Sequence, residues 1–154
     1  MYYEVFETEL GWIAIVSSTN GVVRTSLLEL TPTSALGAVK PESDHALHGY
    51  ERNIEIRALI AAYCAGESVD LSGSEIDVAG VSPFLKKAWE VCRTIPFGET
   101  RSYRWLAEKA GNIRAARSAG QAMARSRLPL LVPCHRVVAL DGSLHGFGGD
   151  GLPL

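Results

Sequence analysis

The part of the sequence that most constrains the fold is residues 102–125, SYRWLAEKAGNIRAARSAGQAMAR. Ser102 can cap a helix over residues 103–110, and the Gly-Asn pair that follows can end it and cap a second helix over residues 113–125. Two short helices joined by such a turn are typical of a helix-turn-helix. Because helix pairs are common, the pattern favours nucleic-acid binding without deciding it.

The expected second helix has two unlike faces. At 100° per residue, its basic and polar side chains fall within about 60° of one direction, and these are Arg114, Arg117, Ser118, Gln121 and Arg125. The opposite side carries Ala116, Ala119, Gly120 and Met123. The basic face suits a phosphate backbone or insertion into a groove, and the alternative is a solvated helix face.

Charge divides the chain in the same way. Residues 1–80 hold four Lys and Arg against twelve Asp and Glu, a net charge of −8. Residues 81–154 hold eleven against five, a net charge of +6. The contrast indicates a module that faces a polyanion, joined to one that does not touch it, although a merely solvated basic surface would look the same.

The first half is expected to be mixed in structure. Apolar-rich segments at 3–7, 12–16 and 22–28 predict three strands, joined by turns at Thr8–Gly11 and Asn20-Gly21. We expect a loop over residues 31–49 and then a helix from Ile56 to Tyr63 that stops at Gly66.

The sequence changes character after residue 78. Ser82-Pro83 is a good helix start, and helical spacing continues to Ile95 before Pro96. We therefore predict an α+β chain with two domains, residues 1–78 and 79–154.

Composition excludes several classes of protein. With 47% hydrophobic and 21% charged residues, the chain of 154 residues is globular. No apolar run approaches the roughly 20 residues that span a bilayer, and the acidic start is unlike a signal peptide. We therefore expect a cytoplasmic protein that does not associate with a membrane. Three cysteines without a CxxC pair disfavour a disulfide framework or a zinc site, and we expect Cys64 and Cys92 to be core residues.

The candidate for chemistry is Cys134. It follows an apolar run broken by prolines, a place where cysteines are commonly buried and inert. Three features argue for reactivity here: His135 is adjacent, Arg136 is cationic, and a glycine-rich loop over residues 141–149 follows. Cationic neighbours lower the pKa of a thiol and raise its thiolate fraction. The sequence therefore predicts an activated thiol that faces a pocket.

Pro133-Cys134-His135-Arg136-Val137 resembles the acceptor-site motif of the O6-alkylguanine-DNA alkyltransferases. The resemblance runs from about Ser82 to Gly149 in the same order and spacing, through Phe97-Gly98-Glu99-Thr100, Ser102-Tyr103, Ala110-Gly111-Asn112, Ala115-Ala116-Arg117 and Gly142-Ser143-Leu144-His145-Gly146-Phe147. It implies a ribonuclease H-like αβ N-terminal domain with a small antiparallel sheet. It also implies a mostly helical, winged-helix-like C-terminal domain that contains the helix-turn-helix.

The resemblance implies direct repair of double-stranded DNA that contains O6-alkylguanine, with O4-alkylthymine as a further substrate. The damaged base leaves the stack and its alkyl group passes irreversibly to Cys134, one turnover per protein. No cofactor or metal is implied, and we expect a monomer that associates with the nucleoid when bound to DNA. His135 would activate the thiol and Tyr103 would donate a proton to the departing guanine. The implied DNA contacts are Tyr103, Arg104, Asn112 and Arg117, and the implied pocket walls are Met123, Val137 and Gly148.

Two departures leave alternatives open. Family members commonly carry Asn-Pro where this chain has Ser126-Arg127, and they continue with a helix whose Glu orients the histidine, whereas this sequence ends at Leu154. Either the sequence is a truncated form or another carboxylate substitutes. A non-catalytic lesion-recognition protein and a cysteine hydrolase using Cys134 and His135 are the competing interpretations; the first usually has Trp at the acceptor position, and the second lacks an evident orienting residue.

Overall fold

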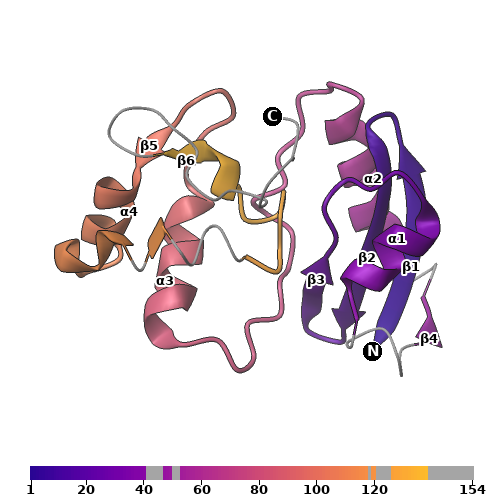
Figure 1. Ribbon diagram of the computed structural model, residues 1–154, viewed down its shortest axis with the longest axis horizontal. Helices are drawn as coiled ribbons and strands as arrows, with labels where there is room; N and C mark the ends of the chain where they lie inside the picture. Colours follow the sequence, from indigo (N-terminus) through magenta and orange to yellow (C-terminus); the bar gives the residue numbers. More distant parts are fainter. Residues whose placement is uncertain (41–46, 50–52, 118, 121–125, 139–154) are drawn as a thin grey trace. The chain divides into compact units, whose positions relative to one another are not determined.

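The computed structural model describes residues 1–40, 47–49, 53–117, 119–120 and 126–138 (Figure 1). The chain divides into two compact units. The first is Met1–Asp77 together with Arg127–Leu131, and the second is Val78–Ser126 together with Val132–Leu154. The division after Asp77 falls one residue from the expected boundary. The segment Arg127–Leu131 was expected in the second domain but belongs to the first unit. Its backbone accepts hydrogen bonds from Thr25 there.

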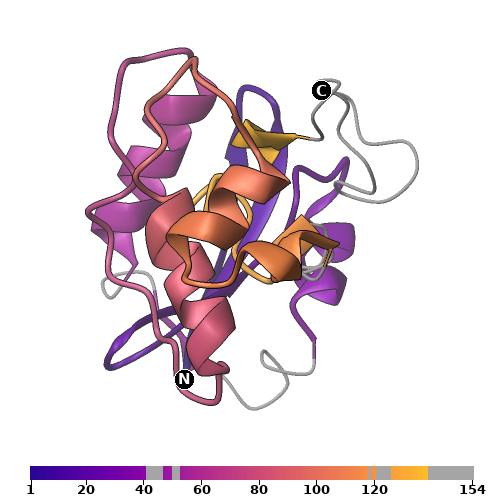
Figure 2. The ribbon, with the colours of Figure 1, turned by 90° about the vertical axis from the view of Figure 1, so that its left-hand side faces the viewer.

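The first unit contains a four-stranded sheet of order β3-β2-β1-β4. Strands β1 (Tyr2–Thr8), β2 (Gly11–Ser18) and β3 (Gly21–Thr25) are antiparallel, and β4 (Leu47–His48) pairs parallel to β1. The alternation of side chains buries one face of β1 and β2 against α1 (Pro32–Ala38) and the other against α2 (Ile54–Cys64). The two helices therefore cover opposite faces of the sheet (Figure 2).

The loop expected over residues 31–49 is partly wrong, because it contains α1 and β4. Thr31 caps α1 by accepting from the Ser34 N–H at 3.0 Å, and Pro32 occupies the first turn. This is a standard helix start, hidden by the polar composition of the segment. The third strand also ends early, at Thr25, because Ser26 Oγ accepts from the Ala14 N–H at 2.9 Å and interrupts the ladder.

A buried carboxylate joins three elements of the first unit. Glu4 on β1 is 3% exposed, and its Oε1 accepts from Arg57 Nη1 on α2 at 3.0 Å. Its Oε2 lies 3.2 Å from His48 Nε2 on β4. The contact gives His48 a structural partner.

The second unit is mostly helical, as expected. Its elements are α3 (Pro83–Cys92), β5 (Arg101–Ser102), α4 (Tyr103–Lys109), the 3-10 turns η1 (Ile113–Ala115) and η2 (Cys134–Arg136), and β6 (Val137–Val138). Ser82 and Ser102 cap the two α-helices, accepting from Leu85 N–H and Trp105 N–H. The mixed α+β class is thus confirmed. The expected helix over 113–125 begins as a 3-10 turn, and its residues 118 and 121–125 lie outside the described part.

Candidate functional site: a buried thiol beside a tyrosine

The acceptor candidate Cys134 opens the 3-10 turn η2. The Cys134 N–H donates to Val132 O at 2.7 Å, and the Arg136 N–H donates to Pro133 O at 2.9 Å. The first bond closes a tight turn centred on Pro133, and the second closes the 3-10 turn that follows it. Pro133 has no N–H and so cannot donate to a strand ladder. Cys134 is 3% exposed, so its thiol lies inside the unit.

A short parallel pairing brings Tyr103 to the same place. Strands β5 and β6 align Arg101 with Val137 and Ser102 with Val138. Tyr103 follows β5 directly and Cys134 begins the turn just before β6, so residues 31 apart become neighbours. Burial and the negative charge of a Cys134 thiolate both raise the pKa of Tyr103. The phenol therefore stays protonated, and it interacts electrostatically with a negative charge on the sulfur.

Burial overturns the expected activation of the thiol. It raises the pKa of Cys134 to about 12, against a smaller lowering by the backbone N–H groups of Cys134 and His135. Desolvation wins because a thiolate in an apolar interior loses its hydration. The guanidinium of Arg136 makes its contacts elsewhere: its Nη1 donates to Ile95 O at 2.8 Å, and it lies 5.7 Å from the Phe97 ring.

His135 is kept neutral. Burial, with help from the positive charge of Arg136, lowers its pKa to about 4. A neutral imidazole is a proton acceptor near pH 7, whereas an imidazolium is not. The pair therefore rests as a thiol beside a neutral base rather than as an ion pair.

The expected DNA-contacting side chains lie at the surface of the second unit. Arg104 on α4, Asn112 and Arg117 are exposed, and Tyr103 is partly buried. Asn112 Oδ1 accepts from the Arg114 N–H at 3.2 Å and so caps η1, as its position in the Gly-Asn turn predicts. Among the expected pocket residues, Val137 is fully buried, whereas Met123 and Gly148 lie outside the described residues.

One neighbour of the acceptor cysteine has no signal in the sequence. Cys92, on α3, is fully buried as expected, but a negative charge on Cys134 raises the pKa of its thiol further. The two cysteines are thus within electrostatic reach of each other, although 42 residues separate them. Cys64 is buried in the first unit, as expected.

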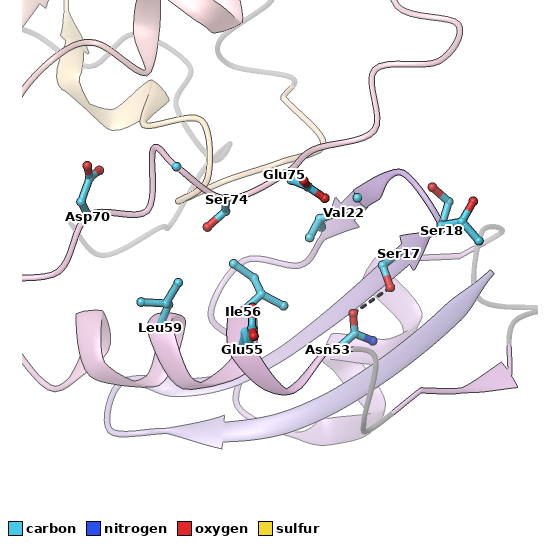
Figure 3. A pocket seen from close by; sticks show the side chains of 13 residues that line it. Ser17, Ser18, Val22, Asn53, Glu55, Ile56, Leu59, Asp70, Ser74 and Glu75 are labelled. Carbon is cyan, nitrogen blue, oxygen red and sulfur yellow. Dashed lines mark hydrogen bonds between the residues drawn. The ribbon is translucent and has the colours of Figure 1, made fainter.

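A separate hollow lies in the first unit (Figure 3). It has a volume of about 630 Å³ and lies between the end of β2, the first turns of α2 and residues 70–75. Ser17 Oγ donates to Asn53 Oδ1 at 2.7 Å on its wall. None of the residues expected to act in catalysis or DNA binding lines this hollow.

The described residues contain neither a membrane-spanning helix nor a metal-binding cluster. No helix in this part of the chain is long and apolar enough to cross a bilayer. Over the same residues, no group of three or more His, Cys, Asp or Glu side chains is arranged to hold a metal ion.

These features define a class: a two-unit α+β protein whose helical unit encloses a cysteine next to a tyrosine, close to exposed basic side chains. The family model for the DNA binding domain of 6-O-methylguanine DNA methyltransferase matches residues 83–153. The Bacillus subtilis constitutive methylated-DNA–protein-cysteine methyltransferase is 33% identical over 150 residues, which cover 97% of this chain and 87% of that protein. The Methanosarcina acetivorans protein of the same description is 30% identical over 96% of this chain and 89% of its own length. The chain belongs to the methylated-DNA–protein-cysteine methyltransferase family.

The identity is higher with a relative that is matched over a shorter stretch. A Mycobacterium leprae methylated-DNA–protein-cysteine methyltransferase is 44% identical over 88 residues, 57% of this chain. That alignment spans about half (52%) of the relative's length. The crystal structure of Mycobacterium tuberculosis OGT in complex with DNA superposes with a TM-score of 0.79 at 30% identity, covering 97% of this chain and 85% of that one.

Proposed function

We propose that this protein repairs alkylated double-stranded DNA by direct reversal. An O6-alkylguanine, or an O4-alkylthymine, leaves the base stack, and its alkyl group moves to Cys134. The observation that carries the proposal is the enclosed Cys134 thiol with Tyr103 beside it and neutral His135 next to it in sequence. Membership of the family and the DNA-bound relative support the same reaction.

The atoms balance without a cofactor. His135 accepts the Cys134 proton, through a water molecule as the family resemblance implies, and the sulfur attacks the alkyl carbon. The carbon–O6 bond breaks, and its electron pair stays on the guanine. Tyr103 donates a proton to the base and so stabilises the departing anion. The product is a thioether, which has no good leaving group, so each molecule acts once.

The high pKa of Cys134 has a role in this scheme. A thiol that is protonated and enclosed at rest does not react with unrelated electrophiles. Deprotonation then accompanies occupation of the site by the base, when the proton of the sulfur can pass to His135. We infer that burial restricts the single turnover to DNA substrates.

The exposed basic residues of the second unit bind the DNA. Arg117 fills the gap that the extruded base leaves, while Arg104 and Asn112 contact the backbone. Extrusion is required because the O6 alkyl bond at a base edge is out of reach within a stacked duplex. The net charge of +6 on residues 81–154 supports this assignment.

Intact mass spectrometry after incubation with an O6-methylguanine duplex tests the reaction. The wild-type protein should gain one methyl group on Cys134, and Cys134→Ala should gain none. Cys92→Ala is the matched control, because it removes a second buried thiol of the same unit and should still accept the methyl group. An unmodified wild-type protein in excess methylated DNA would rule the reaction out.

The raised pKa of Cys134 also favours a second candidate, a lesion-recognition protein that binds O6-alkylguanine without transfer. It predicts tighter binding to the methylated duplex than to the unmodified one, with no gain in mass. The same two measurements therefore separate the candidates.

Finer features complete the proposal. The N-terminal domain is ribonuclease H-like, with helices on both faces of its sheet, and the acceptor domain is winged-helix-like. Met123, Val137 and Gly148 wall the base pocket. The protein acts as a monomer in the cytoplasm, on the nucleoid when bound to DNA, because one chain contains both the acceptor and the basic side chains. Light scattering of the complex with a short duplex should give one protein per lesion.

A further inference from the structure

The residues shortly before Cys134 in the sequence belong to the first unit. The segment Arg127–Leu131, here called the lead segment, belongs to that unit, and only Val132 and Pro133 separate it from the acceptor. Leu128 and Leu131 are fully buried. The placement of Cys134 therefore depends on how this segment is fixed.

Thr25, the last residue of β3, binds the lead segment twice. Its N–H donates to Arg127 O at 2.9 Å, and its Oγ1 donates to Pro129 O at 3.1 Å. Thr25 is 5% exposed, so both bonds are shielded from water. One buried residue thus satisfies two alternate carbonyls of a segment about a hundred positions away in sequence.

The backbone next to these bonds is strained. Leu130 has φ +72°, a left-handed conformation that crowds the Cβ of any residue other than glycine. Such a conformation persists only where the surrounding structure holds it. On one side of Leu130, Thr25 Oγ1 donates to the carbonyl of Pro129. On the other side, Leu131 is fixed by its complete burial.

The side chain of Arg127 adds a third contact. Its Nη2 donates to Asp77 O at 3.2 Å, within the same unit. Arg127 stands at the position where the resembled family commonly has the proline of its Asn-Pro pair, and Ser126 stands in place of the bracing asparagine. Thr25 and Arg127 therefore provide, in this chain, contacts that hold the segment leading to the acceptor.

We propose that Thr25 is a positioning residue for alkyl transfer. It never touches the DNA or the reacting atoms. By bonding Arg127 O and Pro129 O it keeps Leu130 in its strained conformation, and so sets where Cys134 stands relative to the extruded base. This inference rests on the proposed alkyl transfer.

Thr25→Val tests it, since valine keeps the shape of threonine and removes only the Oγ1 donor. In single-turnover methyl transfer from O6-methylguanine duplex, the rate constant at saturating DNA should fall about tenfold or more, because small displacements of reacting atoms cost rate steeply. The DNA concentration giving half the maximal rate should stay within about twofold of wild type, because Thr25 does not contact DNA. Thr25→Ser retains the donor and should restore the rate.

Thr8→Val is the matched control. Thr8 is also a buried threonine of the first unit; its Oγ1 donates to a backbone carbonyl, Gly11 O, at 2.8 Å and accepts from the Leu10 N–H at 3.2 Å. The same chemical change there should lower the thermal midpoint but leave the transfer rate unchanged. Circular dichroism checks that each variant is folded at the assay temperature. If Thr25→Val is not folded, Arg127→Met, which loses the bond to Asp77, should slow the same step.

The outcomes are separable. If the wild-type protein accepts no methyl group, the proposed function is wrong. If it does accept one, and folded Thr25→Val reacts as fast as Thr8→Val, the positioning role of Thr25 is wrong; in the fallback, an Arg127→Met variant with the wild-type rate overturns it. A loss confined to the saturated rate and reversed by serine supports it.

Discussion

At the scale of single residues, the chemistry of Cys134 is decided by solvent rather than by sequence neighbours. His135 and Arg136 are adjacent in the chain, yet the guanidinium of Arg136 is engaged at Ile95 O. With Cys134 only 3% exposed, desolvation raises the pKa of its thiol to about 12. The resting acceptor is therefore protonated, and the proton must leave during the reaction.

This resting state predicts slow reaction with a small thiol reagent. In free protein at pH 7, iodoacetamide should modify Cys134 roughly a hundredfold more slowly than it modifies a free cysteine, because only the thiolate reacts. The rate should rise about tenfold per pH unit from pH 7 to 9, as the thiolate fraction rises. Peptide mass spectrometry assigns the modified residue. Rapid labelling at pH 7, equal to that of a free cysteine, would contradict the resting thiol.

His135 gives a prediction for stability in acid. Its pKa is lowered to about 4 in the folded protein, so between pH 6.5 and 4 the unfolded chain binds more protons than the folded one. The stability due to this group is complete above pH 6.5 and is lost as the pH falls through 4, up to about 3 kcal/mol. Urea unfolding at pH 7 and pH 4.5 measures the loss. His135→Gln should show a smaller decrease, and an equal decrease in both proteins would exclude His135 as its source.

At the scale of elements, the starts of helices were the most readable features. Ser82 and Ser102 cap the helices that follow them, as their side-chain oxygens predict. The same kind of signal at Thr31 and Pro32 was outweighed by the polar surroundings of α1, which is why a loop was expected there. The two-residue strands β5 and β6 had no sequence signal, since pairs this short have no periodicity.

The cap at Ser102 gives a prediction for α4. Ser102→Ala should lower the free energy of unfolding by about 1 kcal/mol, because the Trp105 N–H loses its acceptor. It should also slow methyl transfer, since Tyr103 is the first residue of this helix. Ser82→Ala removes the equivalent cap of α3, which carries none of the proposed site residues, and should lower stability without slowing transfer. Equal transfer rates in the two variants would show that the cap does not position Tyr103.

At the scale of the whole molecule, charge is divided between the halves of the chain. A net charge of −8 on residues 1–80 and +6 on residues 81–154 confines attraction for a polyanion to the later half. The overall net charge of −2 does not reveal this division, because the charges of the two halves nearly cancel. Affinity for DNA should therefore follow the local charge.

Salt dependence measures that attraction. If about five phosphates are neutralised, the dissociation constant for a duplex should rise roughly five-hundredfold between 50 and 200 mM salt, as counterions are released. Arg114→Ala removes one exposed cation and should lower the slope of log Kd against log salt by about 1. Fluorescence anisotropy with a labelled duplex gives both values. An affinity that does not change with salt would argue against binding through the phosphate backbone.

Sequence by itself determined the acceptor motif, the helix caps, the charge division and the first two strands. Each of these depends on residues within a few positions of one another, or on simple sums. Tertiary structure alone decided the pKa of Cys134, the approach of Tyr103 and the hold of Thr25 on Pro129 O. Desolvation depends on everything that surrounds a group, and a hydrogen bond across 104 positions depends on how the backbone returns to β3. Local patterns contain neither kind of information.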